Sequence, residues 1–326
     1  MPEPSSPKRR GRLFRCGSAF VALLAVAGYL VVQYITGGAS GPGCKVVSGK
    51  GDGASYEFTP EQAVNAATIT AVGTARGLPE RAVTIALATA LQESALRNID
   101  HGDRDSLGLF QQRPSQGWGT PKEIMDPTYS AGEFYDHLVK VPGYTRLPLT
   151  DAAQRVQRSG FPQAYAKHEP DAALLAAALT GQSAATLTCE GRPAATRASG
   201  PDGVRAALVR DFGRDALEPA GAQVDGSAAV APTPSASATG GSGGRTVTLP
   251  VDPGTDEAAG RGARQRGWQL AHWAVANAAE LHIARVTYAG REWVAGNTAS
   301  QWRSVAAKGT AGAERTADAV RIVTMR

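Results

Sequence analysis

The sequence predicts a mainly α-helical protein with a small α+β module at its C-terminal end, and three observations carry this prediction. Between residues 56 and 216, helix-start signals repeatedly precede apolar residues at helical spacing. Residues 217–244 are rich in Ala, Pro, Ser, Thr and Gly and have almost no bulky apolar side chain, which is typical of a linker. Beyond residue 262, an amphipathic helix precedes alternating segments that indicate strands.

We therefore expect six segments along the 326-residue chain. They are a basic cytoplasmic segment (1–18), a transmembrane anchor or signal (19–36), a tether (37–55), a helical domain (56–216), a linker (217–261) and a small α+β module (262–326).

The N-terminal region carries a membrane or export signal. Residues Ala19–Ile35 are apolar apart from Gln33, and a cluster of basic residues precedes them. This order places the N-terminus in the cytoplasm and everything after residue 36 outside. A retained single-pass anchor in the cell membrane is the first expectation, and secretion after cleavage near Ala39 is the alternative.

The charge distribution argues against a nucleic-acid partner. The formal net charge is +5, and the five basic residues between Lys8 and Arg15 account for all of it. Because no basic stripe remains in the body of the chain, we expect no nucleic-acid binding.

Local signals define about six helices in the central domain. Thr59 is an N-cap residue and Pro60 opens a helix to about Arg76. The helix from Glu80 to about Arg97 is apolar on nearly every face, which is typical of a buried central helix. Further helices are expected from Asp126-Pro127 to about Val139, from Thr150, over Ala172–Leu179 and over Pro201–Phe212, with almost no strand signal between them.

The C-terminal module is expected to combine a helix with a small sheet. The pattern indicates a helix over Trp268–Ile283, a hairpin turning at Ala289-Gly290 and a closing strand over Val320–Met325. Its only histidines, His272 and His282, cannot supply three zinc ligands with an open fourth position. We therefore expect a non-metal packing or binding module whose partner is the wall or an envelope protein.

Two cysteines are expected to form a disulfide. Cys16 lies on the cytoplasmic flank, whereas Cys44 and Cys189 bracket the helical domain on the exported side. In an oxidising compartment they are the natural pair. Closing so long a loop would stabilise the fold by about 4–5 kcal/mol in the chain-entropy model.

Glu93 and the residues that follow it carry the strongest functional signal. Glu93-Ser94 ends the apolar helix, and Ser106-Leu-Gly-Leu-Phe-Gln111 follows about a dozen residues later. This combination resembles the catalytic stretch of the lysozyme-like superfamily, in particular the bacterial lytic transglycosylase and goose-type domains of actinobacterial envelope proteins. The similarity spans residues 58 to 180 or so.

The resemblance implies a lysozyme-like fold and cleavage of the MurNAc-GlcNAc β-1,4 bond of peptidoglycan. Glu93 would be the catalytic acid, because an apolar helix desolvates its carboxyl group and raises the pKa toward the range that proton delivery needs. Ser106, Gly108 and Gln111 are expected to bind the glycan. Gly108 permits close backbone approach, and the Gln111 amide can both donate and accept hydrogen bonds.

Two aromatic residues are further candidates for substrate binding. The family's third motif, Ala-Tyr-Asn-Ala-Gly, has only a partial counterpart in Gln163-Ala-Tyr165-Ala, without the Asn. Tyr165 is expected to hydrogen-bond to Glu93 or line the groove, with core packing as the alternative. Trp118 is expected to stack on a sugar face or, alternatively, to cap the core.

Asp103 and Asp105 are candidates for a second acid. A hydrolase needs a second carboxylate, whereas a lytic transglycosylase needs one acid, because the substrate's own C6 hydroxyl attacks. Loop acids of this kind more often form turns and pair with a neighbour such as Arg104, which favours single-acid chemistry. The loop lacks the Gly and terminal Glu of a calcium loop, so we expect no metal and no cofactor.

The incomplete third motif keeps a second hypothesis open. In it, the domain is a catalytically inactive lysozyme-like protein that binds glycan or acts as a scaffold in the cell envelope.

Overall fold

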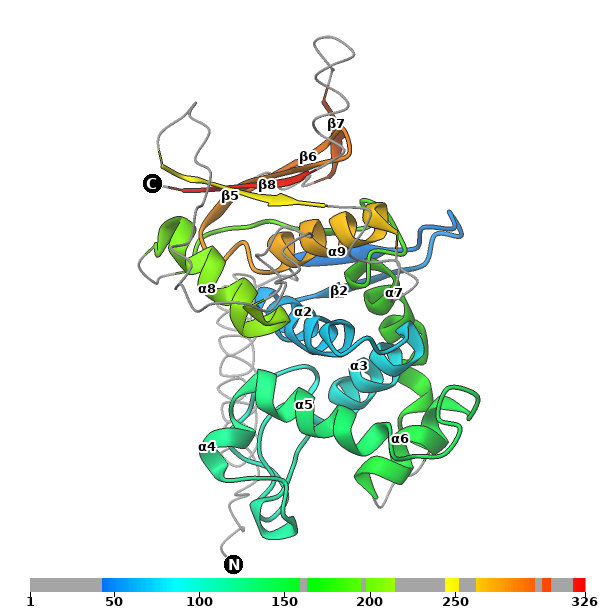
Figure 1. Ribbon diagram of the computed structural model, residues 1–326. Helices are drawn as coiled ribbons and strands as arrows, with labels where there is room; N and C mark the ends of the chain where they lie inside the picture. Colours follow the sequence, from blue (N-terminus) through cyan, green and yellow to red (C-terminus); the bar gives the residue numbers. More distant parts are fainter. Residues whose placement is uncertain are drawn as a thin grey trace, which may run out of the picture. The chain divides into compact units, whose positions relative to one another are not determined.

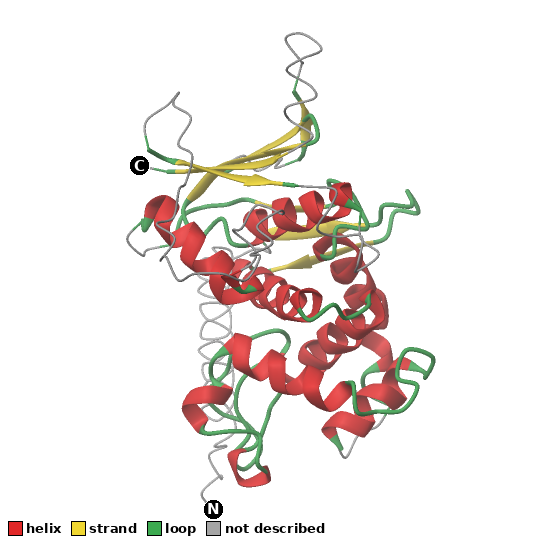
Figure 2. Ribbon diagram, in the orientation of Figure 1, coloured by secondary structure: helices red, strands yellow, loops and turns green. Residues whose placement is uncertain are grey.

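The computed structural model describes residues 43–158, 163–194, 198–214, 244–251, 262–296, 301–305 and 319–325. All of them belong to one compact unit that spans residues 42–326. Helices dominate its N-terminal part and a sheet lies in its C-terminal part (Figure 2). The expectation of a helical region followed by a small C-terminal module with strands is confirmed at this level.

The helical part is built around α3 (Glu80–Ser94), which is buried on nearly every side. It packs against α2 (Pro60–Ala75), α5 (Pro127–Leu138), α6 (Leu149–Gln157) and α7 (Glu169–Leu179), and α8 (Gly200–Phe212) packs on α2 (Figure 1). The short α4 (Pro121–Ile124) and the 3-10 turns η1 (Pro114–Gln116) and η2 (Ala166–His168) complete it. These helices lie close to where local signals place them.

Helix starts follow the capping chemistry that the sequence indicates. Thr59 forms a capping box with Gln62: its hydroxyl accepts from the Gln62 N–H at 3.3 Å, and the Gln62 Oε1 accepts from the Thr59 N–H at 2.7 Å. Asp126 caps α5 by accepting from the Thr128 N–H at 2.8 Å and the Tyr129 N–H at 3.3 Å.

A three-stranded antiparallel sheet lies where the sequence predicts almost no strands. Its order is β2-β1-β3, with β1 (Cys44–Val47), β2 (Ser55–Phe58) and β3 (Leu187–Cys189). The segment interpreted as a tether to residue 55 therefore contains β1 and the start of β2. Strands of three or four residues carry too little alternation to be recognised before their partners are known.

The disulfide expected between Cys44 and Cys189 is present, and it joins two strands of this sheet. The two cysteines are directly paired in the β1–β3 register, and both are buried. The bond fixes the start of the described chain to a strand 145 residues further on.

The C-terminal sheet has the order β4-β8-β5-β6-β7 and is antiparallel throughout. Its strands are β4 (Thr246–Pro250), β5 (Ile283–Tyr288), β6 (Arg291–Val294), β7 (Arg303–Ser304) and β8 (Ala319–Thr324). The predicted hairpin turn is confirmed, with positive φ at Ala289 (47°) and Gly290 (68°). β4 lies inside the segment interpreted as a linker, where it pairs with β8 from the far end of the chain.

Helix α9 (Ala263–Ala276) lies between this sheet and the helical part (Figure 1). It begins and ends earlier than the predicted helix over 268–283, and it is buried on nearly every side rather than on one face. Two glycines make the close packing possible. A Cβ on Gly181 would overlap the Gln265 carbonyl group, and one on Gly267 would overlap the Tyr288 ring.

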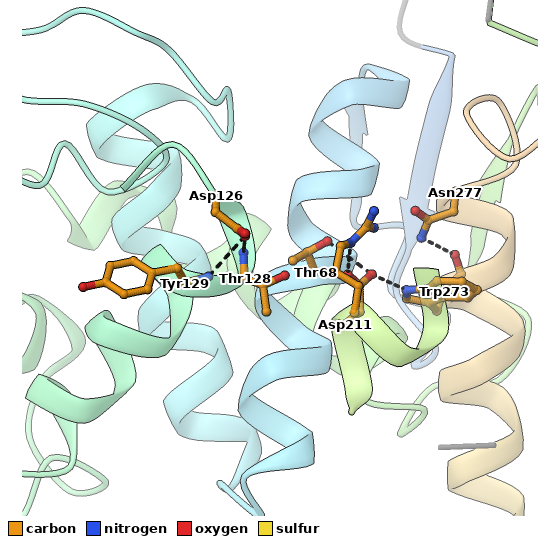
Figure 3. A network of polar contacts seen from close by, with 8 residues as sticks. Thr68, Asp126, Thr128, Tyr129, Asp211, Trp273 and Asn277 are labelled. Carbon is orange, nitrogen blue, oxygen red and sulfur yellow. Dashed lines mark hydrogen bonds and ion pairs between the residues drawn. The ribbon is translucent and has the colours of Figure 1, made fainter. Parts of the chain in front are cut away.

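Buried polar contacts join α9 to the helices beneath it. The Asp211 carboxylate of α8 accepts hydrogen bonds from Trp273 Nε1 at 2.8 Å, from Thr68 Oγ1 at 3.3 Å and from Arg210 Nε at 2.8 Å (Figure 3). Gln269 Nε2 donates to Thr74 Oγ1 at 2.6 Å. Because a buried carboxylate requires such partners, these bonds fix α8 and α9 against α2.

The expected membrane segment, residues 19–36, lies outside the described residues. Within the part of the chain that the structure describes, no helix is both long enough and apolar enough to cross a bilayer.

Candidate active site

Glu93 is the penultimate residue of α3, at the point where the helix ends abruptly. Ala95 and Leu96 both adopt positive φ, 53° and 57°, and their N–H groups donate to the carbonyl groups of Leu91 and Ala90, both at 3.0 Å. The helix therefore ends three residues before the predicted end near Arg97. This left-handed termination turns the chain out of α3 and into the loop that carries the Ser106–Gln111 motif.

Ser94 attaches that motif to α3. Its hydroxyl donates to the Leu109 carbonyl oxygen at 2.8 Å and to the Ala90 carbonyl oxygen at 3.1 Å, and it is buried. Leu109 and Phe110 are fully buried, and the Phe110 ring stacks on Phe134 with centroids 4.6 Å apart. The Glu-Ser pair and the later motif therefore form one packed unit.

The Glu93 carboxylate is held by residues from α6 and from the chain after it. The Tyr165 hydroxyl donates to Glu93 Oε1 at 2.6 Å, and Tyr165 is fully buried. This is the first of the roles expected for Tyr165, and it also places the ring in the core. Gln157 contributes a second hydrogen bond to the carboxylate, while its Nε2 donates to the Phe110 carbonyl oxygen at 2.7 Å.

Burial raises the pKa of Glu93, and this effect outweighs the hydrogen bonds from Tyr165 and Gln157, which act to lower it. The net result keeps the carboxyl group protonated to a higher pH than an exposed glutamate. Glu93 thus has both the environment and the fixed orientation that a proton donor requires.

Gly108 is required by its backbone contacts. Its φ is 74°, and a Cβ at this position would lie 2.7 Å from the Ile124 carbonyl oxygen. Its N–H donates to the Ile99 carbonyl oxygen at 2.7 Å. Only glycine fits this approach of the loop to α4, so the residue has a structural role independent of any ligand.

Ser106 and Gln111 lie at the two ends of the motif. Ser106 is buried, and its N–H donates to the Asp103 carbonyl oxygen at 3.1 Å. Gln111 adopts φ 48°, and its Nε2 donates to the His101 and Gly108 carbonyl oxygens, both at 3.3 Å. The amide expected to bind the glycan is therefore engaged by its own loop in this structure.

Trp118 is partly buried and packs on the side of the domain formed by α5. Its ring lies 4.2 Å from the His137 ring, at an interplanar angle of 37°. One face of the indole is therefore covered by the protein, as in the packing alternative, and sugar stacking at this residue stays a prediction.

The two candidate second acids differ in their surroundings. Asp105 accepts from Arg113 Nε at 2.7 Å and from the Ser115 N–H at 2.8 Å. Hydrogen bonds from Ser115 and Arg113 hold the pKa of this carboxyl well below its usual range. Asp103 is 92% exposed, with Arg104 Nε 4.0 Å away. Both acids sit in a turn with arginine neighbours, the arrangement that favours single-acid chemistry.

Sequence reasoning missed Gln157 and His168. Gln157 is the last residue of α6 and belongs to no motif, so only the folded chain brings it to Glu93. His168 Nε2 lies 3.2 Å from Gln92 Oε1, next to Glu93 on α3, and burial lowers the pKa of its imidazole. Among the residues described, no cluster of three His, Cys, Asp or Glu side chains could hold a metal ion.

Comparison with protein-family models gives a partial match. A family model described as VldE, C-terminal domain, matches residues 223–316, less than a third of the chain. The matched range includes β4, α9 and β5 to β7, and it excludes both β8 and Glu93. No curated protein matches the chain.

Proposed function

We propose that this protein cleaves the glycan strand of peptidoglycan at the MurNAc-GlcNAc β-1,4 bond, with Glu93 as the catalytic acid. The observation that carries the proposal is the Glu93 carboxyl group, which is largely buried, has a raised pKa and is oriented by the Tyr165 hydroxyl at 2.6 Å. The motif resemblance from Glu93 to Gln111 supplies the substrate class.

In this mechanism Glu93 acts twice. Its protonated carboxyl group donates a proton to the glycosidic oxygen, and the bond from that oxygen to the MurNAc C1 breaks. The resulting carboxylate then takes the proton from the C6 hydroxyl of the same MurNAc, whose oxygen attacks C1 and closes a 1,6-anhydro ring. Tyr165 and Gln157 stabilise the carboxylate between the two steps, because both hydrogen bonds favour its ionised form.

The surroundings of the loop acids favour this single-acid route over hydrolysis. A hydrolase would need a second carboxylate opposite Glu93. Both carboxylate oxygens of Asp105 already accept hydrogen bonds, one from Arg113 and one from the Ser115 N–H, and Asp103 is almost fully exposed. Hydrolysis through Asp105 would require this carboxylate to give up its hydrogen bonds to Arg113 and Ser115.

The proposed location is the outer side of the cell membrane. The apolar segment 19–36 would hold the chain as a single-pass anchor, or the chain would be secreted after cleavage near Ala39. The Cys44–Cys189 disulfide supports an oxidising compartment outside the cytoplasm. Peptidoglycan is then the partner of the Glu93 region, and an envelope protein is a candidate partner for the C-terminal region.

Digestion of purified peptidoglycan by the full chain tests the proposal. We expect muropeptides lighter by one water than reducing products, and we expect Glu93→Gln to abolish their release. Glu80→Gln is the matched control. Glu80 lies on the same helix, burial also raises its pKa, and Thr180 Oγ1 donates to it at 3.3 Å. Reducing sugars as the products would select hydrolysis instead.

The contacts of Gln111 and Trp118 support an alternative, a catalytically inactive glycan-binding or scaffold protein. Both candidate glycan-binding side chains already contact the protein itself. If the protein is retained on insoluble peptidoglycan and releases no muropeptides, the result would support this alternative and contradict the enzymatic proposal.

A further inference from the structure

The C-terminal sheet has one face on α9 and one face directed away from the helices (Figure 1). Val286, Trp293 and Ile322 are fully buried on the α9 side. Because side chains alternate along a strand, their sequence neighbours point to the opposite face. We call that opposite face the outer face, and it carries Arg285, Glu292, Arg303 and Arg321 together with Val294, Val323 and three threonines (Thr246, Thr248 and Thr287).

Strand register places the three arginines of the outer face in one connected group. Arg321 is opposite Thr287, which is opposite Glu292, which is opposite Arg303. The row from Arg321 to Arg303 therefore crosses three strand spacings, about 14 Å. Arg285 is opposite Val323, two residues from Arg321, so the two arginines are diagonal neighbours about 7–8 Å apart at their Cα atoms.

The outer face has an unbalanced positive charge. Glu292 is the sole acid in the five described strands, and its Oε2 lies 3.5 Å from Arg285 Nε. Arg303 and Arg321 are exposed, and within the described part of the chain neither forms an ion pair. The sequence alone does not reveal this patch, because its arginines lie on three separate strands between residues 285 and 321 and only sheet pairing brings them together.

A hollow of about 450 Å³ opens at one side of this face. Its lining includes two charged residues, Arg285 and Arg245, which precedes β4, and two apolar residues of the outer face, Val294 and Val323. Arg245 is fixed there because its carbonyl oxygen accepts from the Thr324 N–H at 3.0 Å. Two arginines, Arg245 and Arg285, thus line the hollow. Arg303 and Arg321 extend the positive charge across the rest of the outer face.

We propose that the outer face of the C-terminal sheet binds a flexible polyanion made of glycerol phosphate units. Guanidinium groups match phosphate oxygens with two parallel hydrogen bonds. The three arginines of the outer face, with Arg245 beside them at the hollow, therefore suit a chain of repeated phosphates. The short carbon links between the phosphates would lie against Val294 and Val323, which line the hollow. This proposal concerns a surface separate from Glu93 and does not depend on the proposed catalysis.

The side chains of the outer face argue against the other polyanions and against a bilayer. Single-stranded nucleic acids are held by exposed aromatic rings, but the aromatic residues of these strands, Tyr288 and Trp293, are buried on the α9 side. Membrane-surface binding uses large apolar anchors such as Trp, Phe or Leu, and the described outer face offers only valines.

Titration of the full chain with a synthetic glycerol phosphate oligomer tests this proposal. Raising the salt from about 50 to about 200 mM is expected to weaken binding on the order of 50-fold, as for a ligand that contacts about four basic groups. Arg285→Gln with Arg321→Gln is expected to weaken it by about tenfold, because each exposed ion pair contributes a factor of a few. Glu292→Gln is expected to tighten binding by a few-fold, a gain that misfolding cannot produce.

The matched control is Lys122→Gln with Lys140→Gln, which removes two exposed charges from α4 and the end of α5 and should leave the affinity unchanged. Equal loss in the control pair would show that only net charge matters and would overturn the site. Tighter binding to an oligonucleotide with the same number of phosphates, or to phosphatidylglycerol vesicles, would likewise overturn the assignment of the ligand. An unchanged affinity in the Glu292→Gln variant would overturn the assignment of the site to the outer face.

Discussion

At the scale of single residues, Tyr165 and Gln157 control how Glu93 holds its proton. Burial alone would favour the neutral carboxyl group strongly, and such a group would release its proton poorly. The hydrogen bonds from the two side chains counter part of this effect because they favour the ionised form. A carboxyl group that acts first as an acid and then as a base needs such an intermediate pKa, because it is protonated once and ionised once in each catalytic cycle.

Replacing Tyr165 with Phe is expected to raise the pKa of Glu93 further. The variant removes a donor to the carboxylate and keeps the ring that fills the core. Because the proposed reaction needs protonated Glu93, the alkaline limb of the pH-activity profile should move to higher pH. Carbon-13 NMR titration of the Glu93 carboxyl group measures the same shift without activity. Tyr129→Phe is the control, and a Glu93 pKa that falls or stays constant in Tyr165→Phe contradicts the assignment.

At the scale of elements, His272 joins α9 to α7 and to the loop before β3. Its Nδ1 lies 2.7 Å from the Ala178 carbonyl oxygen, and its Nε2 accepts from the Thr186 N–H at 3.3 Å. The two contacts are satisfied together only by the neutral tautomer with its hydrogen on Nδ1. The imidazole is fully buried beside Trp268, and burial lowers its pKa to about 4.

This histidine is expected to make the fold sensitive to acid. In the unfolded chain an imidazole binds its proton near pH 6.5, and in the folded chain it does so only near pH 4. Its contribution is therefore complete above pH 6.5 and is lost as the pH falls from 6.5 through 4, by on the order of 3 kcal/mol in total. Urea unfolding across this range measures the loss.

Two variants isolate that contribution. His272→Gln should flatten the pH dependence by one proton, whereas His101→Gln, at a side chain that is 80% exposed, should leave it unchanged. A slope that persists in His272→Gln would show that other groups cause the acid sensitivity.

At the scale of the whole molecule, the C-terminal region is part of the helical body. Trp293 Nε1 donates to the Cys189 carbonyl oxygen at 3.0 Å, and Trp302 Nε1 donates to that of Leu187 at 2.9 Å. β3 is thus bonded to β1 through the disulfide on one side and to the C-terminal region on the other. Loss of that region would expose apolar and polar groups that are now buried.

A chain ending at residue 214 is therefore expected to be destabilised by at least about 3 kcal/mol, because it loses the burial of α9 against α2 and α7. Hydrogen exchange of α7 measures this directly and should become faster. Removal of residues 1–42, which lie outside the described residues, is the control and should leave the exchange unchanged. Equal protection of α7 in both truncations would show that the C-terminal region folds by itself.

Features that depend on neighbouring residues could be predicted from the amino-acid sequence. Caps such as Thr59 and Asp126 mark helix starts, the apolar run after Glu80 marks a buried helix, and Ala289-Gly290 marks a hairpin, because each signal lies within a few residues of its effect. Cys44 and Cys189 were also recognisable as a pair. Glu93 and Tyr165 were singled out by resemblance, and the structure brings them within hydrogen-bonding distance.

Features that depend on distant partners could not be predicted before the folded chain was known. β1, β3 and β4 have three to five residues each, and they are strands because β2, the disulfide and β8 hold them in register. Gln157 meets Glu93, and three arginines meet on one sheet face, through folding alone. One cause explains all of these cases. Helices form from hydrogen bonds between residues that are close in the sequence, whereas sheets and sites form from residues that are far apart in the sequence and meet only in the folded chain.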